Sequence, residues 1–214
     1  MKDESKSASD VKTGYHDLVR HDAIAIMPDK VGRVLDVGGG IGATSVYLKE
    51  QGRADRVFVL DIIEDGFLPG VDAHASVNLD SDNALAEIGE KFDTILCLDV
   101  LEHLVDPWSA VRQLTPLLRP GGVIVASLPN IRHWQVVYPL VVKGTFDLTD
   151  KGLLDRTHMR WFTRKSAIEL MTCSGLKVQQ LEGRLSAKRW RLANALTLGR
   201  MRGLFELQYL IRVG

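Results

Sequence analysis

The residues with the clearest chemical pattern form a glycine-rich turn in the first quarter of the chain. An apolar run at residues 33–37 contains Asp36 and leads directly into the sequence GGGIG at residues 38–42. Glycines at this spacing let the backbone approach a ligand closely, and a helix expected at residues 43–51 offers the free N–H groups of its first turn. The pattern predicts a nucleotide-type ligand here, with a tight strand-to-helix connection as the structural alternative.

A second carboxylate indicates that the ligand contains adenosine. Asp61 ends the next apolar run, 25 residues after Asp36, where a carboxylate can accept hydrogen bonds from both ribose hydroxyls. A dinucleotide fits Asp61 equally well, and the glycine spacing satisfies a relaxed dinucleotide fingerprint. Pyrophosphate would gain nothing from the carboxylate of Asp36, however, whereas a ligand that carries an ammonium and a sulfonium group would. Three further acids at residues 99, 102 and 106 also favour the cationic ligand.

These residues need a frame of strands and helices to hold them. Short runs rich in Val, Ile and Leu predict strands at residues 33–37, 56–60, 75–79, 92–98, 123–127, 176–181 and 205–213. Helices are expected between them, at residues 15–27, 43–51, 82–90, 108–118 and 164–174. The alternation predicts an α/β fold with a Rossmann-like, doubly wound, mostly parallel seven-stranded sheet, helices on both faces and an inserted substrate lid.

The chain has 214 residues, which suits a single domain. We expect a disordered tail at residues 1–11 and one domain at residues 12–214, with the lid at residues 131–163 and a basic segment at residues 184–202. The sequence contains no apolar run long enough for a transmembrane helix, and its start lacks the apolar core of a secretory signal, so a cytoplasmic protein is expected. The two cysteines, far apart, indicate neither a disulfide framework nor a metal site.

The formal net charge of zero is a sum of two opposite parts. Residues 1–130 carry 12 Lys and Arg against 21 Asp and Glu, net −9, and residues 131–214 carry 15 against 6, net +9. The basic part suits an anionic acceptor, or peripheral contact with the inner membrane face through residues 184–202 as an amphipathic helix. A solvated helix face is the alternative for this segment. The sequence has no recognition motif for nucleic acid, which is therefore not expected as a partner.

Four motifs, in order, resemble those of class I S-adenosylmethionine-dependent methyltransferases. They are VLDVGGGIGATSVYL, VFVLD, DTILCLDVLEHLVDP and LRPGGVIVASLPN, and the resemblance covers residues 15–181. Within this superfamily, SLPNIRHW and GTFDLTDKGLLDRTHMRWFT resemble a bacterial subgroup associated with glycosyltransferases of surface-polysaccharide assembly.

The resemblance implies S-adenosylmethionine as the cofactor, S-adenosylhomocysteine as its product, and no metal. Asp36 would orient the methionine portion, the Leu98 carbonyl would take its ammonium group, and the turn backbone would line it at Gly38, Gly39, Gly40 and Gly42. The other implied cofactor positions are Asp61 at the ribose, Ile62 on the adenine, Asp80 or Asp82 at the adenine amine, and the neighbours Leu79 and Asp99.

Methyl transfer from a sulfonium is an in-line displacement, in which the enzyme aligns the acceptor and excludes water. A hydroxyl acceptor must also lose its proton, and a base assists this step. The candidates are His133, which directly follows a strand end, and Asp155 and His158 in the expected lid. As structural alternatives, Asp155 pairs with Arg156 to hold the lid, and His103 is a packed or capping side chain.

The function that these features favour is O-methylation of a sugar hydroxyl in a polysaccharide or glycosylated precursor. The expected partner is therefore a small-molecule or glycan acceptor. Two alternatives stay open: a small-molecule O- or N-methyltransferase of secondary metabolism, and a non-catalytic methyltransferase-like accessory subunit. An NAD-dependent oxidoreductase is disfavoured because the sequence contains no Tyr-x-x-x-Lys pair. The acceptor and the oligomeric state cannot be read from the sequence.

Overall fold

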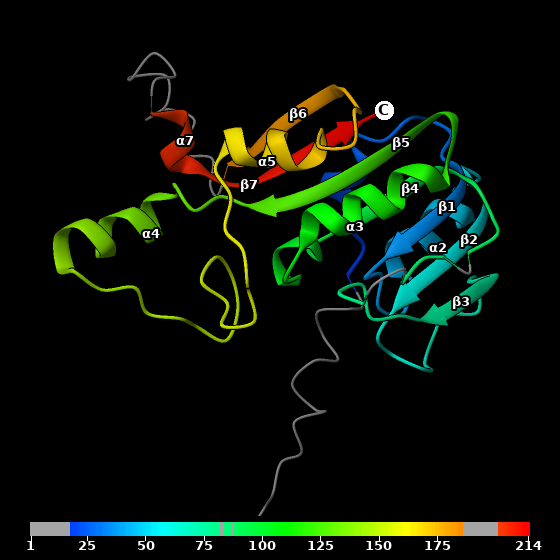
Figure 1. Ribbon diagram of the computed structural model, residues 1–214, viewed down its shortest axis with the longest axis horizontal. Coiled ribbons are helices and arrows are strands. Elements are labelled where there is room, and N and C mark those ends of the chain that lie inside the picture. Colours follow the sequence, from blue (N-terminus) through cyan, green and yellow to red (C-terminus); the bar gives the residue numbers. More distant parts are fainter. Residues whose placement is uncertain (1–17, 82–83, 87, 186–200) are drawn as a thin grey trace, which may run out of the picture.

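The computed structural model describes residues 18–81, 84–86, 88–185 and 201–214 (Figure 1). The expected tail at residues 1–11 lies outside the described residues, as does most of the basic segment at residues 184–202. Among the residues described, no helix has both the length and the apolar character needed to cross a membrane.

Seven strands form one sheet in the order β3-β2-β1-β4-β5-β7-β6. Strands β1 to β5 run parallel to one another, and β7 runs antiparallel to both β5 and β6. The bounds are β1 Gly32–Val37, β2 Ala54–Asp61, β3 Ala73–Ser76, β4 Phe92–Leu98, β5 Leu118–Pro129, β6 Val178–Leu185 and β7 Glu206–Val213. The predicted seven-stranded, mostly parallel sheet is confirmed.

Two apolar cores lie on opposite faces of the sheet, because successive side chains of a strand point in opposite directions. On one face Leu35 and Ile95 pack with α3 (Pro107–Leu114) and α5 (Arg164–Met171). On the other face Val34 and Leu96 pack with α1 (His21–Ile24) and α2 (Ala43–Glu50). Figure 1 shows α3 and α5 in front of the sheet. The expected placement of helices on both faces is also confirmed.

Several element boundaries differ from those expected. Strand β3 begins at residue 73 instead of 75, since Asp72 and Val57 exchange two hydrogen bonds, of 2.8 and 2.9 Å, that start its pairing with β2. Strand β5 begins at Leu118, before the Pro-Gly-Gly sequence that was expected to separate helix from strand, because Leu118 already pairs with Phe92 of β4. In the expected helix at 82–90, residues 84–86 form a turn and residues 88–90 are irregular.

The expected lid leaves the carboxyl end of β5 and returns to α5. It contains α4 (Trp134–Tyr138), a π-helical turn (Pro139–Lys143) and a long connection, and Figure 1 shows α4 well beyond the end of the sheet. The Ile131 N–H donates to the Phe162 carbonyl at 2.9 Å, which joins the two ends of this segment. Its tip exposes apolar side chains, including Val141 (74% exposed) and Val142 (63%). A short helix, α7 (Arg202–Phe205), precedes β7.

Candidate functional site

The glycine turn after β1 has a backbone that side chains would disrupt. Gly38, Gly40 and Gly42 have φ values of 66°, 54° and 86°, in the left-handed region that favours glycine. A Cβ atom at Gly39 would lie 2.5 Å from the carboxyl carbon of Asp36. The residue before α2, Gly42, has no side chain to cap the helix, and in the first turn the Ser45 N–H donates to Asp36, so the turn holds that carboxyl group at the start of the helix.

Asp36 places a carboxyl group directly beneath this turn. The residue is 2% exposed. Burial raises the pKa of Asp36 to about 6; hydrogen bonds from Ser45 act in the opposite direction, and the charge of Asp61 raises it further. A buried carboxylate without a cation is costly, so this position suits a positively charged ligand group.

Asp61 ties the end of β2 to the glycine turn. Its Oδ2 accepts a hydrogen bond from the Gly40 N–H at 2.7 Å, and its Oδ1 accepts one from the Ile62 N–H at 2.7 Å. The side chain of Ile62 is 72% exposed, which leaves an apolar surface beside Asp61 for a flat ring. Asp61 and Ile62 thus lie at the carboxyl edge of the sheet, where the sequence predicts the adenosine.

Asp80, which was expected at the adenine amine, and its neighbour Leu79 lie in different surroundings. Leu79 is buried in the core with α3, so only its backbone can meet a ligand. Asp80 is exposed, and its Oδ1 accepts hydrogen bonds from the Val105 N–H at 2.8 Å and the Asp106 N–H at 3.4 Å. Asp80 therefore joins the loop after β3 to the loop after β4. Asp82 lies outside the described residues.

Asp99 leaves β4 with a φ of 55°, which turns the chain sharply after Leu98. Its N–H donates to the Ser127 hydroxyl at 2.8 Å, and that hydroxyl donates to Asp99 Oδ1 at 2.8 Å. Gln208 also donates to Asp99, and Arg20 forms an ion pair with it. Asp99 is thus fixed at the methionine end of the expected cofactor site.

Arg20 is a candidate binding residue that the sequence reasoning missed. Its backbone N–H donates to Thr44 Oγ1 at 3.1 Å, and its guanidinium reaches both Asp22 and Asp99, so it lies between the start of α2 and the end of β4. A guanidinium in this position can pair with the carboxylate of an amino-acid ligand. Only its place in an expected helix could have pointed to it.

A second cluster lies beside Asp99. It consists of Glu102 and His103, in the 3₁₀ turn Leu101–His103 after β4, and His158, in the connection before α5. One ligand atom from each of the three side chains lies within 4.8 Å of the others. Glu102 is 2% exposed, and its Oε2 has no hydrogen-bond partner. Burial raises the pKa of Glu102 well above its usual value; the charge of Asp99 adds to this, and Arg20 opposes it.

Asp155 supports this cluster from the connection. Its Oδ1 accepts hydrogen bonds from the Thr157 N–H at 2.8 Å and the Thr157 hydroxyl at 2.7 Å, and that hydroxyl lies 3.1 Å from His103 Nδ1. Burial acts in the opposite direction, but the hydrogen bonds from Thr157 hold the pKa of Asp155 below its usual value. The considered pairing of Asp155 with Arg156 is not formed, because Arg156 pairs with Asp150 at 2.8 Å.

The third candidate base, His133, has surroundings unlike those of Asp155 and His158. The side chain is fully buried, and its Nδ1 accepts a hydrogen bond from the Gln135 N–H at 3.3 Å as the cap of α4. Burial lowers the pKa of His133 to about 4, so the ring is neutral at pH 7. A catalytic role for His133 stays a prediction, and the structure favours capping.

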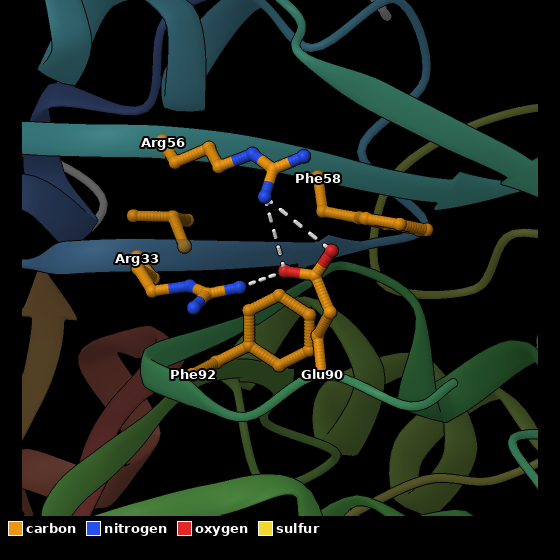
Figure 2. Close-up of a pocket in the computed structure, with 6 residues that line it drawn as sticks. Arg33, Arg56, Phe58, Glu90 and Phe92 are labelled. Atoms are coloured by element: carbon orange, nitrogen blue, oxygen red, sulfur yellow. Dashed lines mark hydrogen bonds and ion pairs between the residues drawn. The ribbon is translucent and has the colours of Figure 1, made fainter.

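The opposite edge of the sheet holds a small pocket that is filled by an ion-pair cluster (Figure 2). Glu90 pairs there with Arg33, near the start of β1, and with Arg56, near the start of β2, the latter at 3.4 Å. Ligands of open α/β sheets bind at the carboxyl ends of the strands. This cluster lies at the amino ends, so its role is to hold two strands to the segment before β4.

Comparison with known proteins now assigns the family. A family model described as "Methyltransferase domain" matches residues 11–181. The chain belongs to the methyltransferase domain family. The family part of the resemblance seen in the sequence is therefore confirmed, while the polysaccharide-associated subgroup is not shown.

Named relatives and solved structures agree with this assignment. The ubiquinone biosynthesis O-methyltransferase of Ruegeria pomeroyi is 39% identical over 160 residues, which cover 71% of this chain and 62% of that protein. The chain thus spans less than two thirds of the length of that relative. The protein of the same name from Azorhizobium caulinodans is 34% identical over 179 residues, covering 78% of this chain and 68% of that one. The crystal structure of an S-adenosylmethionine dependent methyltransferase from Mesorhizobium loti has the same fold, with a TM-score of 0.63, 16% identity, and coverage of 90% and 95% of the two chains.

Proposed function

We propose that this methyltransferase domain transfers a methyl group from S-adenosylmethionine to a hydroxyl oxygen of its acceptor. The observation that carries the proposal is the juxtaposition of two groups of side chains at the carboxyl edge of the sheet. The first is the glycine turn with Asp36, Asp61 and Asp99; the second is the polar cluster of Glu102, His103 and His158 beside Asp99. Relatives named O-methyltransferases support oxygen as the methylated atom.

The residues around the turn fit the cofactor by charge. The buried carboxyl of Asp36 and the fixed carboxylate of Asp99 suit its ammonium and sulfonium groups, and Arg20 suits its carboxylate. The carboxylate of Asp61 suits hydrogen bonds from the ribose hydroxyls, and the exposed side chain of Ile62 offers an apolar surface to the adenine. When bound, the cofactor supplies an activated methyl group: the acceptor oxygen forms a bond to the methyl carbon as the carbon–sulfur bond breaks and its electron pair returns to sulfur.

The second cluster suits the removal of the acceptor's proton. Burial lowers the pKa of His158 below its usual value and the neighbouring His103 lowers it further, so His158 is neutral at pH 7 and able to accept a proton. Thr157 and Asp155 hold the adjacent ring of His103. A proton acceptor of this kind contributes about 10²–10⁴-fold to such reactions.

Two acceptor classes are favoured by different observations. The apolar side chains exposed at the tip of the lid segment, together with the names of the relatives, favour a hydroxylated ring with apolar substituents. The second candidate is the sugar hydroxyl that the sequence motifs favour. It is supported by the edge-to-face pair of Phe146 and Trp161, with ring centroids 5.6 Å apart, since aromatic side chains of this kind stack on sugar rings.

The test is product analysis with methyl-deuterated S-adenosylmethionine and two acceptor panels, one of phenols and catechols and one of nucleotide sugars and glycans. We expect a deuterated methyl ether in one panel, and loss of product in the Asp61→Ala variant. Methyl transfer to nitrogen, or the same product yield in Asp61→Ala as in the wild type, would contradict the proposal. The Glu169→Gln variant, changed on an exposed position of α5, serves as the matched control.

A further inference from the structure

We propose that Glu102, His103 and His158 bind a divalent transition-metal ion, with Zn²⁺ as the best match. No metal is expected from the sequence, because two of these residues lie in one motif and the third lies 55 residues further along the chain. The fold brings them together where the connection before α5 crosses the 3₁₀ turn after β4. The Met159 and Arg160 N–H groups donate to the Glu102 carbonyl there, at 2.8 and 3.0 Å.

The distances are compatible with a common ion. The three ligand atoms lie within 4.8 Å of one another. Two ligands about 2.1 Å from a tetrahedral ion lie about 3.4 Å apart. The longest separation in the cluster would therefore have to shorten by about 1.4 Å to bring all three onto one ion, and His103 and His158 lie in a turn and a loop that can accommodate this.

Glu102 provides an independent observation that points to a cation. Its side chain is 2% exposed, and Oε2 is buried without a hydrogen-bond partner. Buried carboxylates in proteins are normally paired or coordinate a metal, because an unpaired one loses its hydration without compensation. No Lys or Arg forms an ion pair with Glu102 among the described residues, whereas a carboxylate oxygen of Glu102 lies within 4.8 Å of a ring nitrogen of His103 and of His158.

The hydrogen bonds of both histidines at Nδ1 leave Nε2 of each ring as the atom to bind a metal. His103 Nδ1 lies 3.2 Å from the Thr157 carbonyl, and His158 Nδ1 lies 3.3 Å from the Leu153 carbonyl. A carbonyl oxygen can only accept, so each Nδ1 carries the hydrogen, and Nε2 of each ring keeps its lone pair. Metal-binding histidines are typically oriented in this way, by a hydrogen bond from the other ring nitrogen to a carbonyl or carboxylate.

The ligand set identifies the class of ion. Two imidazoles and one carboxylate form the His₂Glu set of catalytic zinc sites, which keep a fourth position open for water or substrate. The same set also accepts Fe²⁺ or Co²⁺, whereas Mg²⁺ and Ca²⁺ prefer oxygen ligands. Asp99 and Asp155 lie close enough to act electrostatically on His158, so the surroundings of the ion are acidic.

The ion would activate the acceptor, a role that rests on the proposed function. The acceptor hydroxyl would take the open position, where the ion lowers the pKa of the hydroxyl and its proton passes to a water molecule. The resulting oxygen anion attacks the methyl carbon; the new carbon–oxygen bond forms, the carbon–sulfur bond breaks, and the electron pair goes to sulfur. Binding of the ion itself does not depend on this reaction.

The test measures metal binding directly, on the full chain freed of metal with a chelator. Titration with Co²⁺ followed by visible absorption, and with Zn²⁺ by calorimetry, should show one site per chain. Affinity should fall on the order of 100-fold in Glu102→Gln and in His158→Gln, since each removes one of three ligands. Glu169→Gln, on an exposed position, should bind as the wild type does. Because Glu102 is buried, His158→Gln in the loop tests the site if Glu102→Gln does not fold.

Absence of saturable binding, or equal affinity in the wild type and His158→Gln, would overturn the inference. An assay of methyl transfer with and without chelator distinguishes failure of the metal site from failure of the proposed function. Metal binding without any methyl transfer would support the site and overturn the proposed function. Methyl transfer that persists after complete removal of metal, with no Co²⁺ spectrum, would overturn the metal site and leave His158 as the base.

Discussion

Replacing Asp36 with asparagine should make the ligand-free protein more stable and a poorer binder of its cofactor. The carboxyl of Asp36 is 2% exposed, and burial raises its pKa from 3.8 to about 6. A tenfold change in a protonation constant corresponds to about 1.4 kcal/mol, so ionised Asp36 costs the folded protein about 3 kcal/mol. Asparagine has nearly the same shape, never ionises, and can still accept a hydrogen bond from Ser45.

The sign of the effect follows from linkage. Between pH 4 and pH 6 the folded protein keeps the proton of Asp36 and the unfolded chain loses it, so wild-type stability falls as pH rises through this window. The free energy of unfolding of Asp36→Asn should exceed that of the wild type by about 1 kcal/mol at pH 4.5 and about 3 kcal/mol at pH 7.5. For a chain of this length the larger difference corresponds to a melting temperature about 6–12 °C higher.

Urea denaturation of both proteins at several pH values measures this difference, and Asp55→Asn, at an exposed position of β2, is the matched control. Calorimetry with S-adenosylmethionine should show at the same time that Asp36→Asn binds at least about tenfold more weakly, since the carboxylate that faces the cationic ligand is gone. A difference in stability that does not change with pH, or a variant less stable at every pH, would refute the account of Asp36.

Three further substitutions test other parts of the structure. Asp61→Ala should weaken S-adenosylhomocysteine binding by on the order of 100-fold in calorimetry, because it removes the carboxylate that holds the glycine turn and the ribose; unchanged affinity would refute that role. Gly42→Ala should lower the free energy of unfolding in urea by about 2 kcal/mol or more, since its φ is 86° and the new Cβ would lie 2.8 Å from Val71 Cγ2. Glu206→Ala should cost about 1.5–3 kcal/mol by the same measurement, because its charged hydrogen bond with Arg202, at 2.5 Å, is lost while the half-exposed Arg202 is rehydrated; a cost below 1 kcal/mol would show that the pair is dispensable.

The sequence predicts the sheet well because its strands are short runs of Val, Ile and Leu with glycines at the turns. Such runs are local signals, and β1, β4 and the start of α2 are found within a residue of their expected bounds. The boundary of β5 was missed because pairing with Phe92 of β4 outweighs the local preference of Pro-Gly-Gly for a turn. Pairing between distant strands is a tertiary effect, which no window of sequence contains.

The places of the expected cofactor residues in the sheet could be predicted for the same reason, and the cluster beside Asp99 could not. Asp36 and Asp61 follow strands at fixed spacing, so their place in the sheet follows from the motif. The cluster of His103 and His158 joins a turn to a loop far along the chain, and Arg20 reaches Asp99 from a segment 79 residues away. The expectation favoured His133 because it follows a strand, but that position is buried as the cap of α4.

The central claim is that the glycine turn binds S-adenosylmethionine. Calorimetric titration of the purified protein with S-adenosylhomocysteine, and separately with NAD, tests it most directly. We predict saturable binding of S-adenosylhomocysteine in the micromolar range, one molecule per chain, and no heat of binding with NAD. Binding of NAD, or no binding of S-adenosylhomocysteine by the folded protein, would contradict the claim.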